Sequence, residues 1–181
     1  MKKIFVKDLM IPISNYVTVK KTDTLVDVLQ ALESEQQANA HAHRDAIVVD
    51  DAGKFLGKVT MIDIFRALEP GYKKIMKGRA TGTLTNNFVM KAVKEFNLWM
   101  EPEKDICQRG SKKTVAEVMH VPEKIEFLQE NDTIEKALNL YVMGVHQPLI
   151  VKASNTVTGA LRFGDIFEVV RKGLLACNID Q

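Results

Sequence analysis

The chain has 181 residues, of which 46% are hydrophobic and 27% are charged, and its formal net charge is +2. This balance is ordinary for a globular protein and argues against nucleic acid as a partner, because nucleic-acid binders concentrate positive charge on one face. No stretch approaches the roughly 20 apolar residues of a membrane-spanning helix, and the two cysteines form no CxxC pair. We therefore expect a soluble, cytoplasmic protein that has no membrane as a partner.

The first third of the chain alternates between strand and helix patterns. The predicted strands cover residues 17–19, 46–49 and 55–60. A turn at 50–53 joins the last two strands, since Asp and Gly tolerate the backbone of a tight hairpin. The helix after the first strand is capped at 22–24 and carries apolar residues at helical spacing, namely Leu25, Val28, Leu29 and Leu32. Another helix is predicted over 61–68, ended by Pro70 and Gly71.

The middle of the chain follows a different pattern. Residues 73–87 are basic and rich in Gly and Thr, which predicts a loop, and their cluster of positive charge is either solvated or an anion-binding patch. An amphipathic helix is predicted near 87–100, with one apolar stripe formed by Phe88, Ala92, Phe96 and Trp99. This helix either packs on its own domain or offers a surface for dimerisation or docking, and Pro102 ends it.

The last third repeats the pattern of the first. Strands are predicted over 125–129, 148–151 and 157–161, with a helix from Ile134, a turn at 154–155 and a last helix over 163–175. The unit is therefore β-α-β-β-α, present twice. Its sheet should be mixed, because a strand–helix–strand step favours parallel pairing and a hairpin gives antiparallel pairing.

The two units are copies of one sequence. Residues 6–29 align with 115–138 at an offset of 109, and residues 56–65 align with 158–167 at an offset of 102. The difference is a seven-residue insertion in the first copy, near 34–43. Each copy has only about 60–70 residues, near the lower limit for a self-sufficient core, so we expect the copies to share one core.

Motifs in this duplicated order resemble a tandem pair of CBS domains, the module named after cystathionine β-synthase. They are Val-Lys-Asp-Leu-Met and Val-Ala-Glu-Val-Met at the start of the copies, the Asp-Thr helix starts, the Ala-Ile-Val-Val-Asp and Pro-Leu-Ile-Val strands, and the closing Gly-x-x-Thr-x-x-Asp-Ile. The predicted boundaries are 1–73 for the first repeat, 74–110 for a linker and 111–181 for the second repeat.

The resemblance implies a fold and a ligand. It implies an α/β (α+β) protein in which two repeats pack about a pseudo-twofold axis and two such units pair as a homodimer. The clefts between the repeats would hold an adenine nucleotide, which is AMP, ADP, ATP or S-adenosylmethionine in relatives, as a regulatory ligand. No cofactor is required.

The best candidate site is the segment from Gly57 to Asp63. Helix-start amides and the hydroxyl of Thr60 can donate to a phosphate, and the carboxylate of Asp63 can accept from both ribose hydroxyls. The resemblance assigns the same roles to these two residues. The alternative is that Asp63 only caps the following helix.

The second copy departs from this pattern. It keeps Asp165 but has Arg162 in place of the threonine. Arg162 would clamp a phosphate, block the cleft, or pair on the surface with Glu168, so we expect two unequal sites.

Two further pairs of equivalent positions complete the candidate ligand-binding set. Arg44 and His146 precede equivalent strands, and the resemblance places them at the edge of the cleft, where a solvated loop is the alternative. Met10 and Met119 would line an adenine pocket or fill the core.

No catalytic set emerges from the sequence, and no metal site is predicted. His41 and His43 share a face of an extended segment but have no further ligand nearby, so a polar loop is favoured. We expect a regulatory module that signals a conformational change to an unknown effector protein. The alternatives are an interaction module with vestigial clefts and, less favoured, a small nucleotide-processing enzyme.

Overall fold

The chain divides into two compact units. The computed structural model describes residues 3–38, 44–77, 85–99 and 102–176. The central unit comprises Val17–His120, and the terminal unit combines Met1–Tyr16 with Val121–Gln181. His41 and His43 lie outside the described residues.

The central unit contains the first β-α-β-β-α repeat. Its sheet has the order β2 (Thr18–Lys20), β3 (Ala46–Val49) and β4 (Phe55–Val59). Helix α1 (Leu25–Ala38) connects β2 to the parallel strand β3, and β4 returns antiparallel before α2 (Met61–Leu68). The predicted mixed sheet is confirmed. The predicted apolar face of α1 is wrong at Leu29, which is exposed, because only Leu25 and Val28 turn fully into the core.

The terminal unit repeats this order. Its elements follow in the order β5 (Phe127–Gln129), α7 (Ile134–Val142), β6 (Leu149–Ala153), β7 (Thr156–Leu161) and α8 (Phe163–Leu175). Again β5 and β6 are parallel, and β6 and β7 are antiparallel. The α/β fold class with two β-α-β-β-α repeats is confirmed. The first predicted strand starts later than expected, because Lys124–Glu126 form a 3-10 turn.

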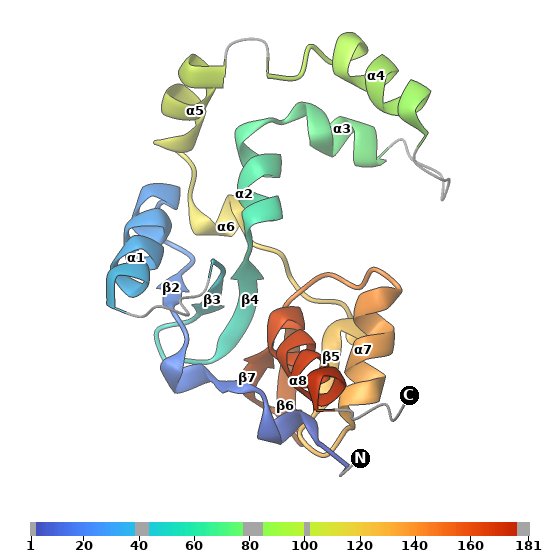
Figure 1. Cartoon of the computed structure of the whole chain (residues 1–181). Helices are drawn as coiled ribbons and strands as arrows, with labels where there is room; N and C mark the ends of the chain where they lie inside the picture. Colours follow the sequence, from blue (N-terminus) through green and yellow to red (C-terminus); the bar gives the residue numbers. More distant parts are fainter. Residues whose placement is uncertain (1–2, 39–43, 78–84, 100–101, 177–181) are drawn as a thin grey trace. The chain divides into compact units, whose positions relative to one another are not determined.

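The leading segments of the two copies, residues 6–12 and 115–120, are exchanged. Strand β1 (Ile11–Pro12) pairs antiparallel with β7 of the second copy, and Figure 1 shows this blue segment beside the red strand. Conversely, α6 (Val115–Val118) belongs to the central unit, where the N–H of Val115 donates to the carbonyl of Asp23 at 2.8 Å. Each compact unit therefore combines parts of both sequence copies.

Buried hydrophobic side chains form two clusters. The central cluster includes Val19, Val28, Val48 and Val59 from the first copy but also Val115 from the second. The terminal cluster is built around the second copy's strands and includes Val6 from the first. Each cluster therefore includes residues of both sequence copies, and the single shared core stays a prediction.

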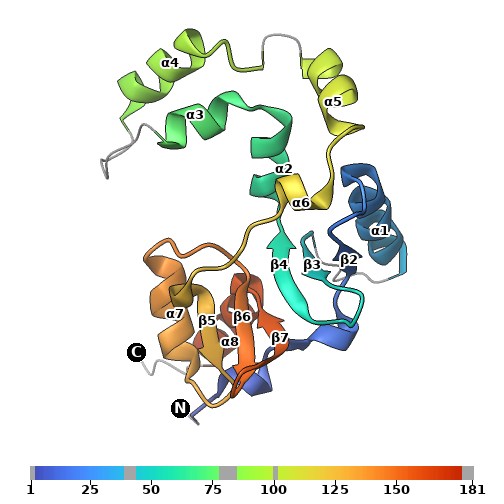
Figure 2. The same ribbon diagram turned by 180° about the vertical axis from the view of Figure 1, so that it is seen from behind.

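The segment between the copies is more helical than predicted. It forms α3 (Gly71–Lys77), α4 (Asn86–Glu95) and α5 (Pro102–Gly110). The predicted loop at 73–87 is wrong for residues 73–77, which are in α3, and for 86–87, which are in α4, and residues 78–84 lie outside the described part of the chain. Helix α4 ends at Glu95, earlier than expected, because Asn97 and Trp99 adopt positive φ. Figure 2 shows α3 and α4 side by side.

Buried Glu69 holds the backbone at the start of α3 and just after the end of α4. Its carboxylate accepts hydrogen bonds from the backbone N–H groups of Gly71 at 2.9 Å and Trp99 at 3.2 Å. The Trp99 indole donates to the hydroxyl of Tyr72 at 2.9 Å. These contacts replace the helical hydrogen bonds that a longer α4 would make. Within the described residues, none of the helices has the length and apolar content needed to cross a bilayer.

Candidate functional site

The first candidate site lies where β4 passes into α2. Thr60 is the N-cap of α2, and its hydroxyl donates to Oδ2 of Asp63 at 2.6 Å. The backbone N–H of Thr60 donates to the same oxygen at 3.1 Å, while the N–H of Asp63 faces the Thr60 hydroxyl at 3.4 Å. This is a capping box, which satisfies helix-start donors reciprocally. The capping alternative for Asp63 is therefore realised, with Thr60 as the N-cap.

The Asp63 carboxylate has more acceptor positions than the cap of α2 requires. Two carboxylate oxygens offer about four acceptor positions, and Thr60 uses two of them, both on Oδ2. Asp63 is 6% exposed, and the guanidinium of Arg66 lies 3.9 Å from Oδ1. The site is thus a nearly buried negative charge at a helix start, held rigidly by its own cap.

The leading segment of the second copy passes beside this corner. His120 and Lys58 exchange two backbone hydrogen bonds, of 2.8 and 3.0 Å. A Cβ atom at Gly57 would lie 2.7 Å from the His120 carbonyl oxygen and 3.0 Å from Cε of Met119. The glycine of the motif is therefore needed for close backbone approach. A ring nitrogen of His120 also comes within 4.8 Å of an Asp63 carboxylate oxygen.

The equivalent corner of the second copy is closed by an ion pair. Arg162 is the N-cap of α8, and its Nε and Nη2 donate to the two oxygens of Asp165 at 2.9 and 2.7 Å. Glu168, which the sequence offered as the alternative partner of Arg162, pairs with Arg171, three positions along α8. A bidentate pair of this kind uses both carboxylate oxygens, so the two corners differ in chemistry.

The residues ahead of the buried strands differ as well. Arg44 is exposed in the central unit. Its equivalent in the terminal unit, His146, is partly buried and places Nδ1 4.0 Å from Oε2 of Glu126, a carboxylate that is itself buried. His146 thus has an acidic neighbour inside its own unit.

Met10 and Met119 occupy matching places in different units. Met119 packs against the central hydrophobic cluster and Met10 against the terminal one. The Thr158 hydroxyl lies 3.9 Å from the Met10 sulfur. Both methionines therefore make core contacts, as expected if they fill the core rather than line an adenine pocket.

Because the leading segments are exchanged, the eight predicted residues separate into two groups of mixed origin. Met119 joins the first copy's Thr60, Asp63 and Arg44, whereas Met10 joins the second copy's Arg162, Asp165 and His146. Sequence reasoning missed His120 and Glu126. For His120 the signal was its place directly after Met119, whereas Glu126 gave none, since it aligns with apolar Val17.

Comparison with known families finds a match for the first repeat. Residues 6–70 match the family described as the CBS domain. The first repeat is thus similar to a CBS domain. No curated protein matches the chain. The second repeat has the same element order as the first, so the chain folds as a CBS pair.

Solved CBS structures share this fold over nearly the whole chain. The structure of CBSX2 in complex with AMP is 20% identical, with a TM-score of 0.58 over 94% of this chain and 98% of that one. A CBS domain-containing protein from Bacillus anthracis is 20% identical, with a TM-score of 0.59 over 93% and 94%. The CBS domain of a bacterial CNNM/CorC family Mg²⁺ transporter in complex with ATP is 18% identical, with a TM-score of 0.55 over 92% and 87%.

Proposed function

We propose that this protein is a cytoplasmic regulatory module that binds an adenine nucleotide at the corner formed by Thr60 and Asp63. The observation that carries the proposal is the preorganised Asp63 carboxylate at the start of α2. It suits the paired hydroxyls of a ribose, and the nearby helix-start amides suit a phosphate. The AMP and ATP complexes of two structural relatives support the same ligand class.

The second corner is proposed to bind more weakly or not at all. A ribose there would have to displace the Arg162 guanidinium from both oxygens of Asp165. Charge-assisted hydrogen bonds are among the stronger ones in proteins, so their loss would offset much of the gain from the ligand. We therefore expect one nucleotide per chain.

In this proposal the protein regulates rather than catalyses, and it acts as a homodimer that signals to an effector protein. A ligand shifts a conformational equilibrium only through contacts that differ between states. Because Thr60 and Asp63 cap α2, a ligand that binds Asp63 would act directly on the position of that helix. The second candidate, an interaction module with vestigial ligand sites, is favoured by the Arg162–Asp165 pair alone.

The test is calorimetric titration of the full chain with AMP, ADP, ATP and S-adenosylmethionine. We expect binding of at least one of them with a stoichiometry near one. Asp63→Asn should weaken it about tenfold or more, since a hydrogen bond to a charged group contributes about 1.5–3 kcal/mol. Asp165→Asn is the matched control and should change affinity by less than about twofold.

A reciprocal variant sharpens the test. Arg162→Thr restores a threonine N-cap in the second copy, and we expect the stoichiometry to rise toward two. Binding of none of the four nucleotides would reject the proposal, and so would equal losses in Asp63→Asn and Asp165→Asn. Circular dichroism of each variant confirms that its fold is intact.

A further inference from the structure

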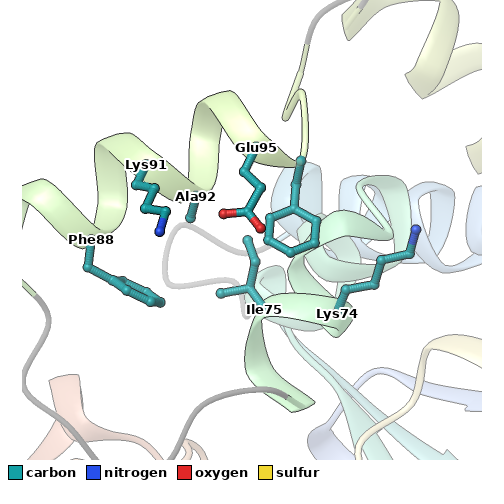
Figure 3. Close-up of a pocket in the computed structure, with 7 residues that line it drawn as sticks. Lys74, Ile75, Phe88, Lys91, Ala92 and Glu95 are labelled. Atoms are coloured by element: carbon teal, nitrogen blue, oxygen red, sulfur yellow. The ribbon is translucent and has the colours of Figure 1, made fainter.

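A pocket separate from the nucleotide corner lies between α3 and α4, in the segment that joins the two repeats. Its volume is about 230 Å³. Figure 3 shows Ile75 of α3 facing the side chains that descend from α4, among them Phe88, Lys91 and Glu95. Phe96, just beyond α4, completes the apolar part of the lining, and Lys74 adds a second cation.

The size of the pocket favours a side chain over a free small molecule. Sites that enclose drug-sized ligands have volumes of about 300–1,000 Å³ and bury most of the ligand. A smaller apolar pocket suits one anchoring aromatic or aliphatic side chain from a protein partner. Helices α3 and α4 lie side by side and provide two walls for such an anchor.

The charge of this segment selects the partner. Residues 71–99 contain six basic residues and one acidic residue, a net charge of +5, although the whole chain carries only +2. Lys74 and Lys91 bring part of this charge to the pocket itself. Complementary charge raises the rate of encounter and excludes partners of the wrong sign.

We propose that the pocket between α3 and α4 binds an acidic peptide segment of a partner protein through one large apolar anchor residue. The anchor contacts Ile75, Phe88 and Phe96, and a flanking carboxylate of the partner lies near Lys91. Glu95 opposes such a partner and limits its affinity. This surface goes beyond nucleotide binding and needs no nucleotide, so it is tested without one.

The experiment selects binders from a phage-displayed library of random dodecapeptides on the nucleotide-free full chain at about 0.15 M salt, where screening leaves only short-range charge effects. We expect enriched peptides to carry net negative charge and at least one Leu, Phe or Trp. The best peptide, synthesised with a fluorescent label, should bind with a Kd on the order of micromolar in an anisotropy titration.

Matched variants on α4 assign the binding to the pocket. Phe88→Ser and Val89→Ser alter neighbouring residues of similar exposure, 39% and 42%, of which only Phe88 lines the pocket. Lys91→Glu changes the charge of a residue that lines the pocket, and Lys94→Glu makes the same change at a residue of α4 that does not line it. We expect Phe88→Ser and Lys91→Glu to weaken binding about tenfold, the two controls to change it less than about twofold, and Glu95→Gln to tighten it.

The possible outcomes distinguish an acidic peptide from other occupants of the pocket. Absence of enrichment, enrichment of basic or purely polar peptides, or equal losses in variants and controls would overturn the proposal. Preferential binding to phosphatidylglycerol vesicles or to single-stranded RNA through Lys91 would overturn it in favour of those partners. If Phe88→Ser alters the fluorescence of Trp99, the Lys91 and Glu95 variants decide the result. These peptide-binding results do not depend on nucleotide binding, because the experiments use the nucleotide-free chain.

Discussion

At the residue scale, one position separates the two copies. Threonine at the start of α2 accepts from and donates to Asp63, whereas arginine at the start of α8 has no acceptor and can only donate to Asp165. The same aspartate is therefore part of a helix cap in one copy and of an ion pair in the other. A carboxylate committed to a guanidinium is a poorer acceptor for a ligand.

Glu117 gives a pH-dependent prediction at this scale. The backbone N–H of Thr114 and the ammonium of Lys113 donate to its carboxylate and lower its pKa from 4.5 to about 2. Because the folded-state pKa lies below the unfolded one, the ionised group stabilises the fold above about pH 4.5. That contribution is lost as the pH falls from 4.5 to about 2.

Urea unfolding of wild type and Glu117→Gln tests this at a series of pH values. Glutamine mimics the protonated side chain, so we expect the wild type to have the higher urea midpoint at pH 7. The two midpoints should converge as the pH approaches the folded-state pKa of about 2. A difference that stays constant across this range would contradict the assignment, because it would not depend on the charge of Glu117.

Alignment of the copies identified the residues of the candidate site but not their contacts. It placed Asp63 and Asp165 at equivalent points, and both lie at helix starts as predicted. The sequence analysis did not single out Asp165 as the partner of Arg162, although the two residues are three positions apart, a spacing at which side chains on a helix are neighbours. The proximity of His120 to Asp63 depends on a backbone pairing between distant segments, which hydrophobic periodicity does not encode.

At the element scale, the close approach of backbones at Gly57 and Gly159 governs how the leading segments pack. A Cβ atom at Gly57 would press on the carbonyl of His120, and one at Gly159 on the carbonyl of Ile11. Because both contacts are with backbone carbonyls, a rotamer change cannot relieve the clash at either glycine. The leading segment would have to move away from the sheet.

We therefore expect Gly57→Ala and Gly159→Ala to lower the free energy of unfolding by about 1–3 kcal/mol, as overpacking does. The control is Gly164→Ala in α8, where an added Cβ meets no atom within 4 Å. Alanine is the better helix former, so this variant should gain up to about 1 kcal/mol. Chemical denaturation measures all three, and a loss in Gly164→Ala equal to the others would refute the packing argument.

The strands and helices of the repeats were predictable because each has a clear period, but the joining segment was not. Its helix boundaries depend on Glu69, whose carboxylate holds the backbone of Gly71 and of Trp99. That contact spans 30 positions of sequence. Local propensity favoured a longer α4, and a tertiary hydrogen bond to a buried carboxylate ended it.

At the scale of the whole molecule, the exchanged leading segments explain why two small repeats suffice. Each unit adds to one repeat a segment from the other, which supplies Val6 to the terminal core and Val115 and Val118 to the central core. A repeat of about 60–70 residues alone would bury too little apolar surface. The sequence reveals the duplication through its offsets, but two similar leading segments give no signal of which segment pairs with which sheet.

Apolar side chains left exposed on α2 and α8 lead to the last prediction, which concerns assembly. Met61, Ile62 and Phe65 form one stripe on α2, and Phe163 and Phe167 lie one turn apart on α8. Exposed apolar groups that cluster on a helix face commonly mark interfaces.

We expect the 20.4 kDa chain to be a dimer by light scattering. Phe65→Glu or Phe167→Glu should make it a monomer, because the added charge would be buried unpaired in the interface. Val142→Glu changes an apolar residue of α7 that is 73% exposed and should leave the dimer intact. A monomeric wild type, or dissociation by Val142→Glu to the same degree, would show that these faces serve another purpose.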